Sequence, residues 1–484
     1  MISKSFLKSS IIYTIGGALP MASSIILLPF YSNFLSSFNF VALSFYISIS
    51  LFLQIIFSFS LDTYFGVKYS QLTLKPNEQK LFVGTVASSL LIGGTIITGL
   101  LLLSGPWLFP MIFGPETGVE FGYFAIASIL TSFFNSFFKT ATNSLIYLKK
   151  PVLFLSFNLI NFIATIGISI AGLYIYPDSI SGPINGRLLS GLIIFILGLY
   201  VFHVNGVWKF ERSFIKEMIE FCAPYMLFVI SIWALSYIDR FYLVSSINST
   251  QLAAYDQLLK CFIGIEFLQN SISAIIFPRV FEIWTKNGEK RTTKETNRYF
   301  NVFTALNIFW LILFCLVIPL FIRLFIPKEE YYQSFDYVGL IAGGFTLRSI
   351  LNFYLSSILY SKSVKNLLKI FFTSAVVQII LTFFMVKYMG LMGAIYAGII
   401  TKTVQVLFSY LFTRSIFSYH FNTFKIYGFP FLYLFLNIGC FVYFPHYSVW
   451  VYLAQLLLFS TAFYFAFRKE IIVVVDQFIL KKKE

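Results

Sequence analysis

The sequence predicts an all-α polytopic membrane protein of about 14 transmembrane helices, arranged as two pseudo-symmetric six-helix lobes plus two C-terminal helices. Two observations predict this fold class: an apolar composition, and apolar runs of about 20 residues that recur along the whole chain. Hydrophobic residues make up 58% and charged residues 11% of the 484 residues. Because this composition is far from that of a soluble domain, and no long polar segment interrupts it, one membrane domain accounts for the chain.

Each apolar run is long enough to cross a hydrocarbon core of ~30 Å as a helix. The first run has no small-residue cleavage site after a short apolar core, so we expect it to be retained as a helix. In chain order the predicted spans are residues 9–35, 40–61, 81–105, 121–147, 151–175, 185–205, 217–245, 252–277, 299–323, 336–360, 366–386, 391–413, 426–444 and 449–467.

The placement of basic residues predicts the orientation, because Lys and Arg in short loops are held on the cytoplasmic side. About 26 of the 35 Lys and Arg fall in the N-terminal segment, the even-numbered connectors and the C-terminal tail. Four fall in the other connectors: Arg187, Arg323, Lys328 and Lys387. We therefore expect a multi-pass protein with both termini cytoplasmic. Contact with anionic lipid headgroups then explains the net charge of +15, and no nucleic-acid partner is expected.

Short similarities indicate that the chain contains two copies of a six-helix unit. SSFNFVALSFY (36–46) resembles SSINSTQLAAY (245–255), and SLIYLK (144–149) resembles SILYSK (357–362). An FxP turn precedes the second match in each half, at Phe113–Pro115 and at Phe325–Pro327. The predicted division is residues 1–205 for helices 1–6, 206–413 for helices 7–12, and 414–484 for two extra helices and a basic tail.

Two copies with an even number of spans keep the same orientation, as in transporters that rock two halves about a substrate site between them. Pro20 and Pro29 in the first helix and Pro224 in the seventh fall in corresponding helices of the two halves. They are either hinges or prolines of the kind that membrane helices tolerate.

Sequence motifs of enzymes and metal sites are absent. The three His residues have no metal-ligand neighbour at helical spacing, and no Walker, GxSxG or HExxH pattern occurs. The four Cys residues lie in apolar runs without CxxC spacing. We expect no catalytic residue, metal site or bound cofactor. The short outer connectors also disfavour a membrane-embedded glycosyl polymerase or ligase, without excluding that alternative.

Ionisable residues within spans are the candidates for a functional site, because such groups usually face a bundle interior or a wet cavity. Arg348 and Lys402 lie ~18 Å and ~16 Å from the outer end of their spans, so they are the strongest candidates to bind a substrate anion; the alternative is structural pairing. Lys260 is shallower and lies one helical turn after Asp256, a spacing at which the two charges can pair. Lys139 is expected to snorkel toward the cytoplasmic surface.

Three acidic residues in spans are candidates for ion coupling or for a gate: Asp239, Asp256 and Glu266. Glu266 lies deepest, where a carboxylate can carry a coupling proton or ion or pair with a cation. Arg240 is close to the outer end of its span and can reach headgroups or a nearby carboxylate. Since adjacent residues point ~100° apart around a helix, Asp239 is expected to meet a different neighbour. We interpret Asp239 and Arg240 first as a gate or structural pair and second as phosphate ligands.

Several segments together resemble the Wzx-type polysaccharide flippases of the multidrug/oligosaccharidyl-lipid/polysaccharide exporter superfamily. They are YTIGGALP and LLPFYSNFLS in the first helix, Pro224 followed by DRF at 239–241, FPRV after the eighth span, and GLMGAIYAGIITK in the twelfth. The resemblance implies a flippase that moves an undecaprenyl-pyrophosphate-linked oligosaccharide across the inner membrane by alternating access, for surface polysaccharides such as the O-antigen of lipopolysaccharide. It also implies a cationic cavity for the pyrophosphate and sugars, a role that fits Arg348, Lys402, Lys260 and Arg240 by type.

The partners implied are the lipid-linked oligosaccharide, membrane lipids and the polysaccharide polymerase machinery, with a proton or sodium gradient as the energy source. Two alternatives within the same superfamily stay open. One is a lipid II flippase of peptidoglycan synthesis. The other is a multidrug or cation antiporter, against which the excess of cations at depth counts, because such a protein should favour an acidic cavity.

Overall fold

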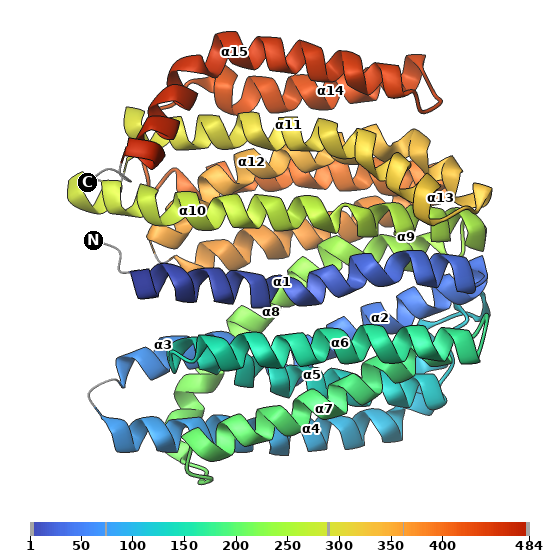
Figure 1. Cartoon of the computed structure of the whole chain (residues 1–484), viewed down its shortest axis with the longest axis vertical. Helices are drawn as coiled ribbons and strands as arrows, with labels where there is room; N and C mark the ends of the chain where they lie inside the picture. Colours follow the sequence, from blue (N-terminus) through green and yellow to red (C-terminus); the bar gives the residue numbers. More distant parts are fainter. Residues whose placement is uncertain (1–3, 73–74, 288–290, 362, 481–484) are drawn as a thin grey trace. The chain divides into compact units, whose positions relative to one another are not determined.

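The structure, a computed structural model, describes residues 4–72, 75–287, 291–361 and 363–480. In these ranges the protein is all-α, as predicted, and its β structure is limited to one isolated bridge between Arg291 and Ser418. Figure 1 shows the helices in chain order: α1 (Lys4–Phe34), α2 (Ser37–Ser58), α3 (Leu61–Gln71), α4 (Pro76–Ile112), η1 (Pro115–Thr117), α5 (Tyr123–Tyr147), α6 (Pro151–Ile175), α7 (Ser181–Asn205), α8 (Arg212–Leu243), α9 (Ser249–Cys261), α10 (Ile263–Asn287), α11 (Lys294–Phe325), η2 (Glu329–Tyr337), α12 (Val338–Tyr360), α13 (Val364–Thr413), η3 (Phe424–Gly428), α14 (Phe429–Tyr443) and α15 (Val449–Leu480).

Twelve segments of the described chain are helical, long and apolar enough to cross a membrane. One of them, Lys365–Thr413, contains two of the predicted spans in a single long helix, α13. A further predicted span, α5, is 25 residues long but contains many Ser, Thr and Asn residues, which lower its hydropathy. It packs against α2, α3 and α7, and a helix covered by other helices needs less apolar surface. Counting α5 and both parts of α13 gives the fourteen predicted spans.

The two halves of the chain have the same order of elements. In each half the second span is interrupted, by Phe59 and Ser60 between α2 and α3 and by Phe262 between α9 and α10. In each half a short 3-10 helix, η1 or η2, follows the FxP turn. This order agrees with the internal repeat. The proline residues of α1 and α8, by contrast, lie inside continuous helices, and Ser23 Oγ donates to the Pro20 carbonyl oxygen at 2.7 Å.

Gly390 divides α13 into its two spans. Its backbone, with φ of 56° and ψ of −131°, is not helical and lies in a region that only glycine adopts without strain.

We expect Gly390→Ala to destabilise the purified protein by about 1–3 kcal/mol, seen as a lower thermal unfolding temperature. Gly398 on the same helix is the control, because a Cβ added there meets no atom within 4 Å. Equal unfolding temperatures for Gly390→Ala and Gly398→Ala would contradict this role.

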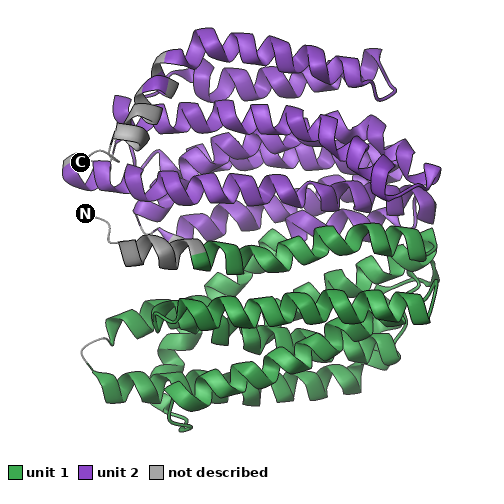
Figure 2. Cartoon of the chain, viewed as in Figure 1, with its two compact units in different colours: residues 1–233 green, residues 234–484 purple. Residues whose placement is uncertain are grey.

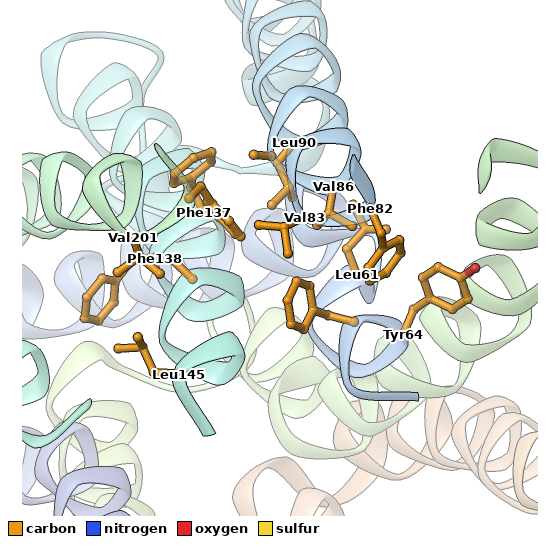
Figure 3. Packing of buried hydrophobic residues seen from close by; sticks show 14 of the residues in the cluster. Leu61, Tyr64, Phe82, Val83, Val86, Leu90, Phe137, Phe138, Leu145 and Val201 are labelled. Carbon is orange, nitrogen blue, oxygen red and sulfur yellow. The ribbon is translucent and has the colours of Figure 1, made fainter. Parts of the chain in front are cut away.

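The chain forms two compact units, residues 1–233 and 234–484, which Figure 2 colours green and purple. They meet in sequence within α8, whereas the predicted lobes, 1–205, 206–413 and 414–484, follow the internal repeat; that division stays a prediction. Unit 1 has an apolar cluster between α3, α4, α5 and α7, part of which is shown in Figure 3, with Phe65, Phe82 and Phe137 fully buried. In unit 2, α12 packs against α11, α13 and α14, and α11 also packs against α15.

Candidate functional site

The seven charged residues predicted to form a site all lie in unit 2, on five helices. They are Asp239 and Arg240 of α8, Asp256 and Lys260 of α9, Glu266 of α10, Arg348 of α12 and Lys402 of α13. Asn248 fixes the start of α9 as its N-cap, because its side chain accepts from the Gln251 amide at 2.8 Å.

Four of these charges form one network, here called the α8–α9 ion cluster: the buried Asp239, Arg240 and Asp256, and the partly exposed Lys260. Asp256 receives two cations, Arg240 Nε at 2.5 Å on one carboxylate oxygen and Lys260 Nζ at 2.6 Å on the other. Arg240 Nη1 also lies 3.2 Å from Asp239 Oδ1, and the Tyr255 hydroxyl donates to Asp239 Oδ2 at 2.8 Å. The cluster holds two positive and two negative charges and is neutral.

Of the two alternatives for Arg240, a headgroup or a nearby carboxylate, the structure shows the carboxylate of Asp256. Asp239 meets a different neighbour, Tyr255, as expected, but it also contacts Arg240, which the helix spacing did not predict. The Arg240 side chain folds back along α8, where Nη1 donates to the Ser236 carbonyl oxygen at 2.6 Å, and a guanidinium in that position can also contact the preceding residue. The pairing of Lys260 with Asp256, one helical turn apart, is confirmed.

Glu266 and Arg348 form a second pair, which is more accessible. Arg348 Nη1 lies 3.0 Å from Glu266 Oε1, and Nη2 donates to Asn270 Oδ1 at 3.0 Å. The side chains of Arg348 and Glu266 are 28% and 40% exposed, against 3% for Asp256. A guanidinium with this exposure can bind a further oxygen ligand without first leaving its carboxylate, since it has five N–H donors.

Lys402 lies beside this pair and has no ion-pair partner. Its ammonium stands over the Phe345 ring, 4.3 Å from the centroid. In the ranges that the structure describes, no carboxylate lies within 4.0 Å of it; Glu266, Arg348 and Asp239 act on it through space. The ammonium also lies close to Gly344 of α12, because a Cβ added there would be 3.5 Å from Lys402 Nζ. Lys402 thus makes a cation–π contact with Phe345 but no ion pair with any carboxylate of the described structure.

Glu266, Arg348 and Lys402 therefore form a second group of charges, here called the α10–α12–α13 cation site. One negative and two positive charges leave a surplus positive charge, whereas the α8–α9 ion cluster has none. The surplus and the exposure of Arg348 suit this place to an anionic group. The three residues come from positions up to 136 apart in the sequence (402 minus 266), so helix packing and not local spacing creates the site.

Two amides next to this site, a buried glutamine and an exposed asparagine, escaped the sequence-based prediction. Gln269, which is 2% exposed, donates through Nε2 to Asn307 Oδ1 at 2.7 Å, and its Oε1 has no hydrogen-bond partner in the described structure. Asn270 holds the Arg348 guanidinium. The signal was the pair Gln269 and Asn270, three and four residues after Glu266 in an apolar run, because amides in such a run also need hydrogen-bond partners.

Lys139, in unit 1, has a carboxylate partner that the sequence did not predict. Its Nζ lies 2.9 Å from Asp62 Oδ2 of α3, while its side chain stays 49% exposed. Its expected reach toward the cytoplasmic surface stays a prediction. Asp62 lies just after the break at Phe59 and Ser60, and Asn143 Nδ2 also reaches it at 3.5 Å. The pair connects α3 to α5.

Metal-binding groups are not found in the described ranges: no three His, Cys, Asp or Glu side chains gather in a way that could hold a metal ion. The four Cys residues, all described, are free thiols.

Comparison with known proteins relates the chain to polysaccharide biosynthesis and to transporter folds. Residues 46–334, more than half of the chain, match the sequence profile of the polysaccharide biosynthesis protein family. A search of the curated proteins finds no significant match.

Solved structures show the fold. The lipid II flippase MurJ in its inward closed conformation has a TM-score of 0.69 at 13% identity, covering 94% of this chain and 99% of MurJ. An inward-facing multidrug resistance MATE family transporter of the MOP superfamily has a TM-score of 0.64 at 13% identity, covering 85% and 98%. A MOP superfamily transporter from Pyrococcus furiosus has a TM-score of 0.55 at 14% identity, covering 85% and 95%. The chain is therefore a multi-pass membrane protein with the fold of these transporters.

Proposed function

Because the chain belongs to the polysaccharide biosynthesis protein family, we propose that it flips an undecaprenyl-pyrophosphate-linked oligosaccharide from the inner to the outer leaflet of the bacterial inner membrane. In this proposal both termini are cytoplasmic, and the substrate crosses by alternating access in a chain that has a transporter fold. The product would feed the assembly of a surface polysaccharide such as O-antigen, with the polymerase machinery as partner.

The observation that carries this proposal is the surplus positive charge of the α10–α12–α13 cation site. A pyrophosphate is the anionic part of such a substrate. Arg348 can offer two parallel N–H donors to phosphate oxygens, and Lys402 adds a charge that no carboxylate cancels. A cation antiporter should present the opposite balance of charge, so the site favours a lipid-linked anion over a cationic drug.

Arg240 and Lys260 are weaker ligand candidates than the sequence suggested. Each is held by Asp256, which cancels much of its charge. A ligand would have to separate a buried pair to reach Arg240, whereas the Lys260 side chain is 22% exposed and is weakened as a ligand only by its ion pair. The α8–α9 ion cluster, which includes Asp239, is better suited to act as a gate or as a fixed support that holds α8 against α9.

Complementation in cells tests the proposed function. We expect the chain to restore export of lipid-linked oligosaccharide in a strain that lacks its own flippase of this class, without any sugar-transfer activity of the purified protein. Sugar transfer by the purified chain would instead favour a glycosyl polymerase or ligase. Failure to restore export, with normal amounts of the chain in the membrane, would contradict the proposal.

Lipid II flipping is the second candidate function, favoured by the similarity to MurJ over nearly the whole of both chains. Two observations distinguish the candidates. Rescue of a strain depleted of its lipid II flippase would support this second function. A gene position among glycosyltransferases of a surface-polysaccharide cluster would support the first.

Glu266 is the carboxylate best placed to couple transport to an ion gradient, because it contacts Arg348 at the cation site and is the more exposed member of that pair. We expect Glu266→Gln to change the dependence of export on an imposed proton or sodium gradient. Transport into vesicles, measured with each gradient and at several pH values, checks this. Glu282→Gln is the control, since Glu282 pairs with Arg279 and Lys286 elsewhere on α10. Unchanged transport and unchanged gradient dependence in Glu266→Gln would exclude a coupling role.

A further inference from the structure

Arg187, six residues into α7, is a cation for which the described structure provides no acidic partner. It is partly buried, and no carboxylate in the described ranges lies within ion-pair distance of its guanidinium. Its Nε–H group is buried and donates to no acceptor there. A guanidinium is always charged and has no acceptor atom of its own, so its buried Nε–H needs an acceptor that the described side chains do not supply.

Two buried hydroxyl groups share this place. Tyr31 of α1 is 4% exposed and Ser169 of α6 is 0% exposed, and neither hydroxyl has a hydrogen-bond partner in the described chain. Ser169 and Arg187 lie close enough to the Tyr31 hydroxyl to interact with it, but none of the three groups makes a hydrogen bond of good geometry with another. Three unsatisfied donors from three helices of unit 1 therefore face one small region.

Close packing of α6 against α7 fixes this arrangement. A Cβ added at Gly186 would lie 2.2 Å from Ser169 Oγ, and one added at Gly172 would lie 2.4 Å from Gly182 Cα. Glycines at these positions let the two backbones approach closely. Because the packing is tight, Ser169 and Arg187 cannot move apart to find other partners without opening the contact between the helices.

We propose that Arg187, Tyr31 and Ser169 bind a small inorganic anion such as chloride inside unit 1. An anion accepts from Arg187 Nε–H and from both hydroxyls at once, and it neutralises the guanidinium. A water molecule can accept from the same groups but supplies no charge. A lipid phosphate would have to pass the packed side chains that bury Nε and both hydroxyl oxygens. The site lies in the other unit from the α10–α12–α13 cation site, so it does not depend on the proposed transport function.

Thermal unfolding of the purified full chain in detergent tests this site. At constant ionic strength, replacing gluconate by chloride is expected to raise the unfolding temperature by about 2 °C, with saturation, because a ligand that binds only the folded state stabilises it. Tyr31→Phe and Arg187→Gln are expected to abolish the chloride effect. Arg323→Gln should keep it, because Arg323 is an exposed arginine that contacts the rings of Tyr332 and Phe335.

The position of a heavier halide provides an independent test that requires no variant. Crystals of the full chain soaked in bromide should show an anomalous peak within hydrogen-bond distance of Arg187 Nε. Three results would overturn the proposal: an unfolding temperature of the wild type that does not respond to chloride, a chloride effect that persists in Tyr31→Phe and Arg187→Gln, or a bromide-soaked structure without a peak at this place. If the variants do not fold, the bromide peak decides.

Discussion

Lys402→Met is expected to lower export of lipid-linked oligosaccharide by at least about tenfold, since a charge-assisted contact to phosphate is worth about 1.5–3 kcal/mol. Methionine keeps most of the length of the side chain and its contact with the Phe345 ring but removes the charge. The substitution breaks no ion pair. A loss of export would therefore reflect weaker contact with the substrate and not a carboxylate that has lost its partner. Export in the complemented strain, divided by the amount of chain in the membrane, is the measurement.

The matched control is Lys369→Met, which removes an exposed lysine from the first part of the same helix. We expect that variant to export at the wild-type rate. If Lys402→Met and Lys369→Met both export normally, Lys402 does not bind substrate.

Arg348 needs a different design, because its removal also leaves Glu266 without its cation. Arg348→Gln is therefore compared with Glu266→Gln and with the double variant. If Arg348 binds substrate, the double variant exports less than Glu266→Gln alone. If Arg348 only neutralises Glu266, the double variant matches Glu266→Gln.

Asp256→Asn is expected to destabilise the protein by about 3–5 kcal/mol, because it removes the carboxylate that Arg240 and Lys260 share in a buried place. Asp256 is 2% exposed, so water cannot replace the lost partner. Denaturant unfolding of the purified chain measures this effect. Adding Lys260→Met to Asp256→Asn makes the cluster neutral again and is expected to recover part of the stability.

Glu282→Gln provides the matched comparison for Asp256→Asn. Glu282 also receives two cations, Arg279 at 2.7 Å and Lys286 at 2.8 Å, but its side chain is 46% exposed. Surface ion pairs contribute little, so this variant should unfold almost as the wild type does. Equal losses for Asp256→Asn and Glu282→Gln would show that burial does not determine the strength of the α8–α9 ion cluster.

The fold was largely predictable from the sequence because membrane spans depend on length and hydropathy, which are local properties. The boundary between the spans of α13 was predicted at 387–390, and the structure has its non-helical residue at Gly390. The single-turn spacing of Asp256 and Lys260 also predicted a contact, because residues four apart share a helix face.

Partners on different helices could not be predicted in this way. Lys139 meets Asp62 and Arg348 meets Glu266 through helix packing that no spacing encodes. The contact between Asp239 and Arg240 was missed because a long guanidinium side chain can fold back along its own helix. The place shared by Tyr31, Ser169 and Arg187 depends on three helices meeting, and two of its members are hydroxyl residues that carry no signal in an apolar run.

Flipping by the purified chain in vesicles tests the central claim most directly. The substrate is an undecaprenyl-pyrophosphate-linked oligosaccharide distributed over both leaflets, and a glycosidase added outside cleaves only the molecules that reach the outer leaflet. We predict that vesicles with the wild-type chain expose nearly all of the substrate to the enzyme, while those with Lys402→Met are much slower. Cleavage limited to the original outer-leaflet pool with the wild-type chain, as in vesicles without protein, would contradict the claim.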